Sequence, residues 1–219
     1  MSERITVAID GPAGVGKSTV ARRIAEKLGY LYIDTGAMYR AVGLWALRAN
    51  VALSDMHRLE QLANEARIEF GPRSGSVLLN GEDVTEAIRA PEIAEAASKV
   101  SLVPAVRRAL VAKQREIGER ASVVMEGRDI GTVVFPGAPV KVYMTASDEE
   151  RAQRRSQEML DMHYDEVAAD IARRDHIDST RRYAPLAAAP DAVVVDTTTS
   201  TVDQVVELVL QLAVKAGLV

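Results

Sequence analysis

The 219-residue sequence contains no cysteine, which excludes disulfides, zinc–thiolate sites and cysteine nucleophiles. Aromatic residues make up only 4% of the chain, so a core has to be built mainly from Val, Ile, Leu and Ala. No apolar run is long enough to span a bilayer, and the N-terminus lacks the apolar region and cleavage site of a secretory signal. These absences predict a cytoplasmic protein with no membrane partner.

An excess of positive charge is also lacking, because the formal net charge is -4. Such a chain does not coat nucleic acid through its overall charge, although a local basic pocket for a small phosphate ligand remains compatible with it. His57, His163 and His176 do not have the spacing of metal ligands. We therefore predict a monomer that binds small molecules and no nucleic acid.

Short β-branched runs alternate with longer helical patterns, as is typical of a parallel sheet covered by helices. Near-continuous apolar runs predict five core strands, at residues 5–9, 30–33, 122–125, 140–144 and 192–195. Helices are predicted over 17–28 and 37–49, and from about 201, where Thr201 and Gln204 fit a capping box. The predicted fold class is α/β, with a five-stranded parallel sheet and helices on both faces.

The region from about 60 to 100 departs from this alternation. Residues 67–70 and 76–79 flank a turn rich in Gly, Pro, Arg and Ser, which predicts an antiparallel hairpin. We therefore predict one domain over 1–219, with a core of residues 1–59 and 101–219 and an insert at about 60–100.

Residues 11–18 match the pattern G-x-x-x-x-G-K-[ST] between a predicted strand and a predicted helix, the context that this phosphate-binding loop requires. Its backbone N–H groups and the helix N-terminus can surround a phosphate, Lys17 can reach the β- and γ-phosphates, and the Ser18 hydroxyl can bind Mg²⁺. The fold prediction thus becomes a three-layer P-loop NTPase fold that binds ATP with Mg²⁺. The predicted ATP-binding residues are Gly11, Pro12, Ala13, Gly14, Val15, Gly16, Lys17, Ser18 and Thr19. The sequence has no Asn-Lys-x-Asp motif, which disfavours a GTPase.

Two further segments follow predicted strands and should reach the same edge of the sheet as this loop. Residues 34–40 combine a helix start with Arg40, which could hold a second phosphate; an ordinary helix start capped by Asp34 or Thr35 is the alternative. Residues 126–129 read Glu-Gly-Arg-Asp, and Glu126 stands where P-loop enzymes place the acid that organises Mg²⁺. An exposed turn with an internal ion pair is the alternative for this segment.

The segment from 148 to 182 is rich in arginine and contains no lysine. The planar arginine fork matches phosphate oxygens, so this composition predicts a lid over about 148–182 that closes on the transferred phosphate. Acids are interleaved, and we expect about half of these arginines to form ordinary surface pairs on helices. The set comprises Arg151, Arg154, Arg155, Arg173, Arg174, Arg181 and Arg182.

Over essentially its whole length the chain resembles the bacterial cytidylate kinases, within the P-loop nucleoside monophosphate kinases. The resemblance rests on four motifs, at residues 11–18, 34–40 (D-T-G-A-M-Y-R), 126–136 (E-G-R-D-I-G-T-V-V-F-P) and 174–181 (R-D-x-x-D-x-x-R). The predicted insert at about 60–100 adds to the resemblance, because bacterial members of that family carry an extra lobe in the acceptor-binding region.

The resemblance implies roles for individual residues. Thr35, Arg40 and Arg128 would bind the phosphate of the acceptor, and Ser98, Arg107 and Asp129 would read the cytosine edge. Asp178, oriented by Arg174, would hold the sugar hydroxyl, with Arg181 near the phosphates. Catalysis would fall to Lys17, Arg128 and Arg181, and metal binding to Ser18 and Glu126.

The predicted reaction is transfer of the γ-phosphoryl group of ATP to CMP or dCMP, giving ADP and CDP or dCDP. An acceptor phosphate is already anionic, so positioning and charge stabilisation suffice without a general base. Two alternatives remain open: a P-loop kinase for another small acceptor, such as AMP, UMP or a hydroxylated metabolite, and an ATP-dependent switch that transfers nothing.

Overall fold

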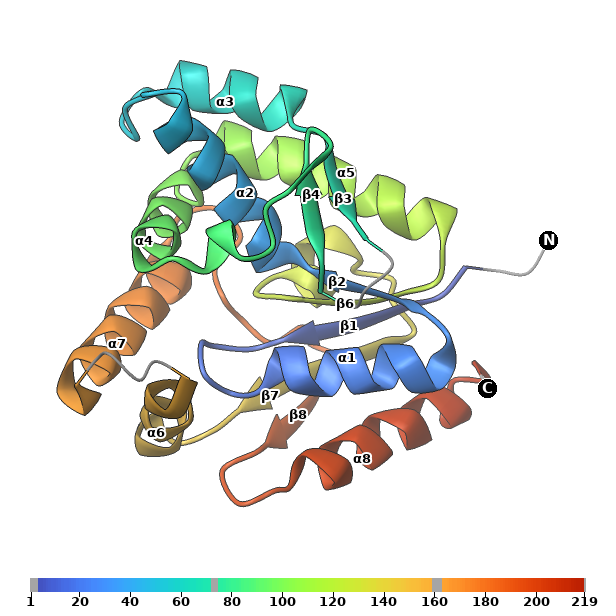
Figure 1. The fold of residues 1–219 in the computed structure, drawn as a ribbon. Coiled ribbons are helices and arrows are strands. Elements are labelled where there is room, and N and C mark those ends of the chain that lie inside the picture. Colours follow the sequence, from blue (N-terminus) through green and yellow to red (C-terminus); the bar gives the residue numbers. More distant parts are fainter. Residues whose placement is uncertain (1–3, 72–74, 159–162, 219) are drawn as a thin grey trace. The chain divides into compact units, whose positions relative to one another are not determined.

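The computed structural model describes residues 4–71, 75–158 and 163–218. The chain divides into two compact units (Figure 1), of which the first comprises Met1–Leu31 with Ala121–Val219 and the second Tyr32–Arg120. The predicted limits of the insert and the lid remain predictions.

A five-stranded sheet with the strand order β2-β6-β1-β7-β8 carries the fold. Its pairs β1–β6, β1–β7 and β7–β8 are parallel, and the β1 residues Val7, Ala8 and Ile9 are fully buried. The predicted α/β class and the five predicted strands are confirmed, with ends that differ from the predicted ones by at most two residues. The strands are β1 (Thr6–Asp10), β2 (Leu31–Asp34), β6 (Val123–Gly127), β7 (Val140–Thr145) and β8 (Val193–Asp196).

The described part of the first unit contains four α-helices. α1 (Lys17–Leu28) and α8 (Val202–Lys215) lie side by side, and Thr201 and Gln204 form the predicted capping box at the start of α8 (Figure 1). α6 (Asp148–Glu158) and α7 (Tyr164–Thr180) pack together through Ala152, Val167 and Ile171. None of the helices in residues 4–71, 75–158 and 163–218 has the length and apolar content to cross a bilayer.

The second unit contains the predicted hairpin, since β3 (Ile68–Phe70) and β4 (Val77–Leu79) are antiparallel. A third strand, β5 (Glu82–Asp83), extends it to a small sheet. Helices pack around one apolar cluster in this unit: α2 (Thr35–Arg48), α3 (Met56–Glu65), the short 3-10 turn η1 (Ala87–Arg89), α4 (Pro91–Val100) and α5 (Pro104–Arg120).

Candidate active site

The glycine-rich loop runs from the end of β1 to the start of α1. Gly16 begins the helix with φ +87°, a conformation that glycine adopts without strain, and the space above its Cα is open. Ser18 and Thr19 are exposed in the first turn of α1, whereas Lys17 is buried and its Nζ donates a hydrogen bond to the Pro12 carbonyl oxygen at 2.7 Å. The loop therefore combines a helix N-terminus, an exposed hydroxyl and a folded-back ammonium group.

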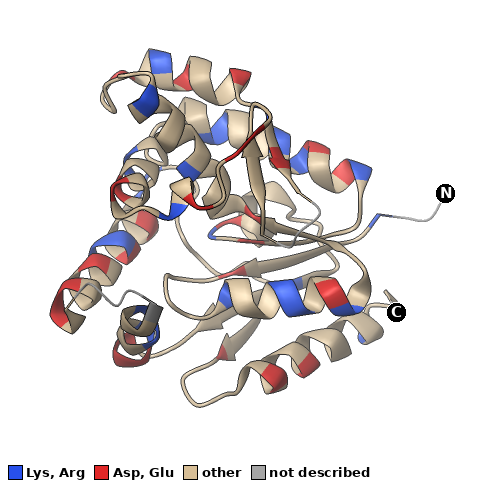
Figure 2. Ribbon diagram, viewed as in Figure 1, with Lys and Arg blue, Asp and Glu red and all other residues tan. Residues whose placement is uncertain are grey.

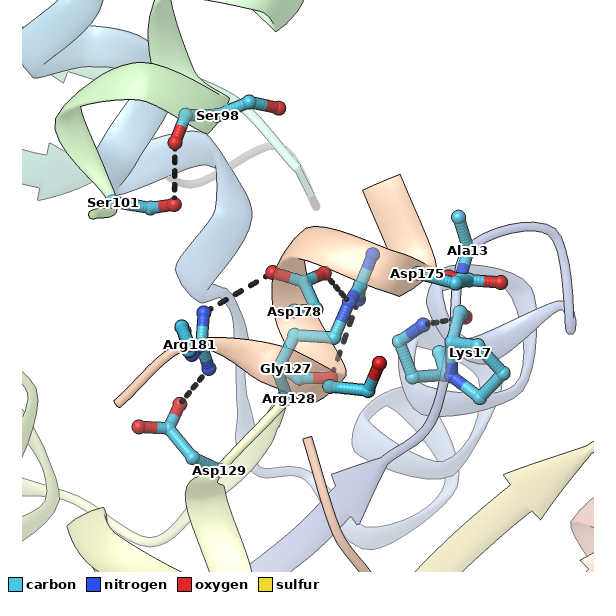
Figure 3. Close-up of polar contacts among 12 residues, drawn as sticks. Ala13, Lys17, Ser98, Ser101, Gly127, Arg128, Asp129, Asp175, Asp178 and Arg181 are labelled. Carbon is cyan, nitrogen blue, oxygen red and sulfur yellow. Dashed lines mark hydrogen bonds and ion pairs between the residues drawn. The ribbon is translucent and has the colours of Figure 1, made fainter. Parts of the chain in front are cut away.

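Two side chains from the arginine-rich helices hold the middle of this loop. The Ala13 N–H donates to Asp175 Oδ1 at 3.2 Å, and Figure 3 shows these two residues close to Lys17. Arg151 donates to the Ala13 carbonyl oxygen at 3.1 Å. Arg151 also pairs with Asp175. Its buried guanidinium thus acts as a structural link between α6, α7 and the loop.

The backbone of α6 also lies directly against Gly14. A Cβ at this position would stand 2.8 Å from the Arg151 carbonyl oxygen, and φ is +79°. The close contact with the Arg151 backbone therefore requires glycine at position 14, independently of whether the loop backbone also approaches a phosphate.

Gly14→Ala is therefore expected to destabilise the fold by about 2–4 kcal/mol, because the methyl group collides with backbone and the left-handed conformation is strained. The loop has to shift, so the KM for ATP should rise as well. Thermal unfolding and steady-state kinetics check both effects.

Gly29→Ala is the matched control, since Gly29 ends the same helix at φ +67° with nothing near its Cβ. It should cost only the conformational strain, about 1 kcal/mol, and leave the KM for ATP unchanged. Equal effects of the two substitutions would show that the contact with Arg151 is unimportant.

The end of β6 carries a connected set of charged side chains (Figure 3). Arg128 Nε donates to Asp178 Oδ2 at 2.9 Å, and Arg181 Nη1 donates to Asp178 Oδ1 at 3.1 Å. Arg181 also forms an ion pair with Asp129, with 4.0 Å between Nη2 and Oδ1. Burial by itself would lower the pKa of Arg128, but Asp178 raises it above its usual value, so the guanidinium is held as a cation.

These contacts exclude an exposed turn at residues 126–129, since Glu126 and Asp129 are buried and Arg128 pairs across fifty residues of sequence. The resemblance implies that Arg174 orients Asp178, but the partners of Asp178 in the structure are other arginines. In the structure Arg174 pairs with Asp170, one turn earlier on α7, while Arg128 and Arg181 hold Asp178. Asp170 and Asp178 both lie one helical turn from Arg174. Because Asp178 already accepts hydrogen bonds from Arg128 and Arg181, Arg174 pairs with Asp170.

Asp10, at the end of β1, was missed by sequence reasoning. It is 4% exposed, and its two carboxylate oxygens accept the N–H groups of Ile130 at 2.8 Å and Gly131 at 2.7 Å. Burial raises the pKa of Asp10 to about 6 although both hydrogen bonds act to lower it. An acid at the last position of a buried strand, immediately before the glycine motif, was the available signal.

Four predicted substrate-binding residues lie in the second unit. Asp34 caps α2 by accepting the Ala37 N–H at 3.0 Å and also accepts a hydrogen bond from Arg40 at 2.6 Å. The helix cap and an ordered Arg40, which were given as alternatives, therefore occur together. Thr35, at the start of the same helix, is 4% exposed.

The other two are Ser98 on α4 and Arg107 on α5. Arg107 is 2% exposed, lies over the Tyr39 ring at 5.4 Å from its centroid, and donates to the Ser101 carbonyl oxygen at 3.5 Å. Ser98 donates to the Ala94 carbonyl oxygen at 3.3 Å and accepts, through its own carbonyl, the Ser101 hydroxyl. Arg107 is thus held in one orientation before any ligand binds.

Acidic and basic residues are interspersed along α6 and α7 (Figure 2). Arg173 pairs with Asp170 one turn away, as ordinary helix pairs do. Arg154 pairs with Glu150 on its own helix and also donates to the hydroxyl and carbonyl oxygens of Thr197, at 3.1 and 2.6 Å. Arg151 and Arg181 are buried and likewise bind residues outside their own helical turn.

Within residues 4–71, 75–158 and 163–218, no three His, Asp or Glu side chains are grouped as a metal site. The exposed Ser18 hydroxyl and the buried Glu126 carboxylate are oxygen donors of the type that Mg²⁺ prefers. Two donors fit a cation that takes its remaining ligands from nucleotide phosphates and water, which is how Mg²⁺ is usually bound in kinases.

The fold resembles that of a solved structure, an uncharacterized protein from Eubacterium ventriosum. The TM-score is 0.54 at 11% identity, with 95% of this chain and 97% of that chain covered. At this identity the similarity concerns the fold alone.

Relatives and a family model give closer matches. The model described as cytidylate kinase matches residues 7–215. A cytidylate kinase of Solibacter usitatus is 58% identical over 216 residues, covering 96% of this chain and 92% of the relative. One from Syntrophotalea carbinolica is 50% identical, with 96% and 92% covered. Because these matches span nearly the whole sequence, the chain belongs to the cytidylate kinase family.

Proposed function

We propose that this protein transfers the γ-phosphoryl group of ATP to CMP or dCMP, giving ADP and CDP or dCDP, with Mg²⁺ bound to the nucleotide. The observation that carries the proposal is the presence in one compact unit of a phosphate-binding loop and an ordered arginine–aspartate network, in a chain of this family. A kinase with an anionic acceptor needs both features, whereas a nucleotide switch has no use for the second.

At the donor end, the loop from Gly11 to Thr19 would bind the phosphates of ATP. Lys17 would leave the Pro12 carbonyl oxygen and turn its Nζ toward the β- and γ-phosphates, which offer a charged acceptor in place of a neutral one. Ser18 and Glu126 would hold Mg²⁺, which would supply neutralisation of the phosphate charge.

At the acceptor end, Thr35, Arg40 and Arg128 would bind the phosphate of CMP, and Asp178 would accept a sugar hydroxyl. Ser98, Arg107 and Asp129 would read the base. Cytosine has an amino donor, which suits the Asp129 carboxylate, and carbonyl and ring-nitrogen acceptors, which suit Arg107 and Ser98. Arg174, one turn before Asp178 on α7, would also help to bind the acceptor.

The proposed mechanism uses no general base, because the attacking phosphate oxygen is already anionic. Lys17, Arg128 and Arg181 would stabilise charge that spreads over the transferred group. The hydrogen bonds of Arg128 and Arg181 to Asp178 order these two side chains in the structure. Residues 148–182 would act as a lid that excludes water, which competes as an acceptor.

A panel of acceptors tests this function. ADP release should be fastest with CMP and dCMP, and slower with UMP and AMP by about tenfold or more, as expected for a base edge that pairs poorly. Equal or faster turnover with AMP or UMP would contradict the proposal that CMP and dCMP are the preferred acceptors. ADP release that is independent of any acceptor would favour a switch.

We further propose that the protein acts as a cytoplasmic monomer on these small molecules, without a nucleic acid or membrane partner. The net charge of -4 disfavours a nucleic acid partner. Sedimentation at assay concentration would reveal a dimer if one forms.

A further inference from the structure

Asp10 connects two functional segments of the first unit that are about 120 residues apart in sequence. The next residue along the chain, Gly11, begins the phosphate-binding loop. The carboxylate binds Ile130 and Gly131, which follow Asp129 directly and open the short π-helical turn η2 (Ile130–Val134). One side chain thus links the start of the donor loop to the segment that carries Asp129.

The contact is bidentate and buried. Each oxygen of Asp10 faces one of two consecutive amide groups, at 2.8 and 2.7 Å, and the residue is 4% exposed. Charge-assisted bonds of this kind are about twice as strong as neutral ones, and two of them from one planar group define an orientation. With a pKa of about 6, the carboxylate is ionised at neutral pH and can accept both bonds.

Burying a carboxylate is costly, so its presence at this position needs a compensating role. The segment that it holds is unusual: Asp129 is followed by a π-helical turn, and its carbonyl oxygen accepts the N–H groups of Val133 at 2.9 Å and Val134 at 3.2 Å. The Asp129 side chain is itself buried and paired with Arg181. A small rotation of this turn would move the Asp129 carboxylate out of reach of a base edge.

We propose that Asp10 is a positioning residue that anchors the η2 turn and thereby sets the selectivity of Asp129 for cytosine. This inference rests on the proposed function, because it assigns to Asp10 the support of the base-reading carboxylate. Asp10 contributes no proton and no direct bond to the substrate in this role.

Asp10→Asn tests the proposal with almost no change of shape. The amide keeps one acceptor but turns an NH₂ group toward one of the two N–H donors, so one buried amide loses its partner. We expect kcat/KM for CMP relative to UMP to fall by about tenfold or more, mainly through the KM for CMP. The KM for ATP should change by less than about twofold, because the loss is confined to the base-reading end.

Thr197→Val is a matched control. Thr197 is 2% exposed and its hydroxyl donates to the carbonyl oxygens of Val15 at 3.2 Å and Thr145 at 3.0 Å, so the substitution also removes buried hydrogen bonds near the donor loop. It should lower the melting temperature and leave the ratio of CMP to UMP activity unchanged. A reduced ratio in this variant would mean that any loosening of the unit alters selectivity, which contradicts a specific role for Asp10.

An unchanged ratio in Asp10→Asn, with or without a lower kcat, would overturn the proposal. A wild-type protein without preference for CMP would instead contradict the proposed function. In that case amide hydrogen exchange at Ile130 and Gly131 tests the anchoring directly. The exchange should accelerate about tenfold or more in Asp10→Asn, and equal protection in the two proteins would overturn the proposed anchoring. Asp10→Ser, which retains one acceptor without a misplaced donor, gives the same comparison if the asparagine variant does not fold.

Discussion

Lys17→Ala is expected to lower kcat by about 100- to 1,000-fold, the loss that follows removal of one preorganised donor to the transition state. Lys17 is the cation of the donor loop and is already buried within it, 2.7 Å from the Pro12 carbonyl oxygen. Its ammonium group can follow the transferred phosphoryl group as charge builds up, which alanine cannot do. The fall should be seen in kcat with saturating CMP and should persist at high ATP.

Lys27→Ala serves as the control, because Lys27 lies exposed in the last turn of the same helix. It should leave kcat unchanged. The circular dichroism spectrum of Lys17→Ala should match that of the wild type, so that the loss of turnover cannot be attributed to unfolding. Near-normal turnover of a folded Lys17→Ala protein would show that the glycine-rich loop has another purpose.

The second large effect is expected at Asp129. Cytosine offers an amino donor to this carboxylate, whereas uracil places a carbonyl oxygen against it, so two acceptors face each other in a buried position. Asp129→Ala should remove most of this discrimination, and the ratio of kcat/KM for CMP to that for UMP should fall by about 10- to 100-fold. Most of the change should come from the CMP side, with ATP affinity largely retained.

Asp129→Asn sharpens the experiment, because an amide can present either its oxygen to cytosine or its NH₂ group to uracil. This variant should gain activity on UMP that Asp129→Ala lacks. Asp129 also pairs with Arg181 at 4.0 Å, and both variants remove the charge of that ion pair. If neither variant changes the preference for CMP over UMP, another residue reads the base.

The parts of the fold that were predictable are those with a local signal. The five apolar runs became the five strands, and α1 begins and ends at the predicted residues because the glycine motif precedes it and Gly29 ends it. The hairpin of β3 and β4 was predicted from its turn residues. The strand β5 and the helices α3, α4 and α5 were missed, since two residues are too few for a strand pattern and the turn-rich hairpin obscured the helical periodicity around it.

The candidate site divides in the same way. Motif spacing identified Lys17, Arg128 and Asp129 as candidates, but contacts that join distant segments gave no local signal. Arg151 was one of seven arginines with the same sequence context, and only its bonds to Ala13 and Asp175 distinguish it from the surface pairs. Asp10 likewise depends on a partner about 120 residues away.

The sequence by itself determined the class of the fold, the phosphate-binding loop and the family, because each depends on the order of residue types along the chain. Tertiary structure alone decided which partners the charged side chains have. Asp10 and Arg128 lie at the carboxyl ends of the parallel strands β1 and β6, which the sheet brings together. Asp178 and Arg181 come from α7 and its end, and spacing along the chain does not encode their contacts with Arg128 and Asp129.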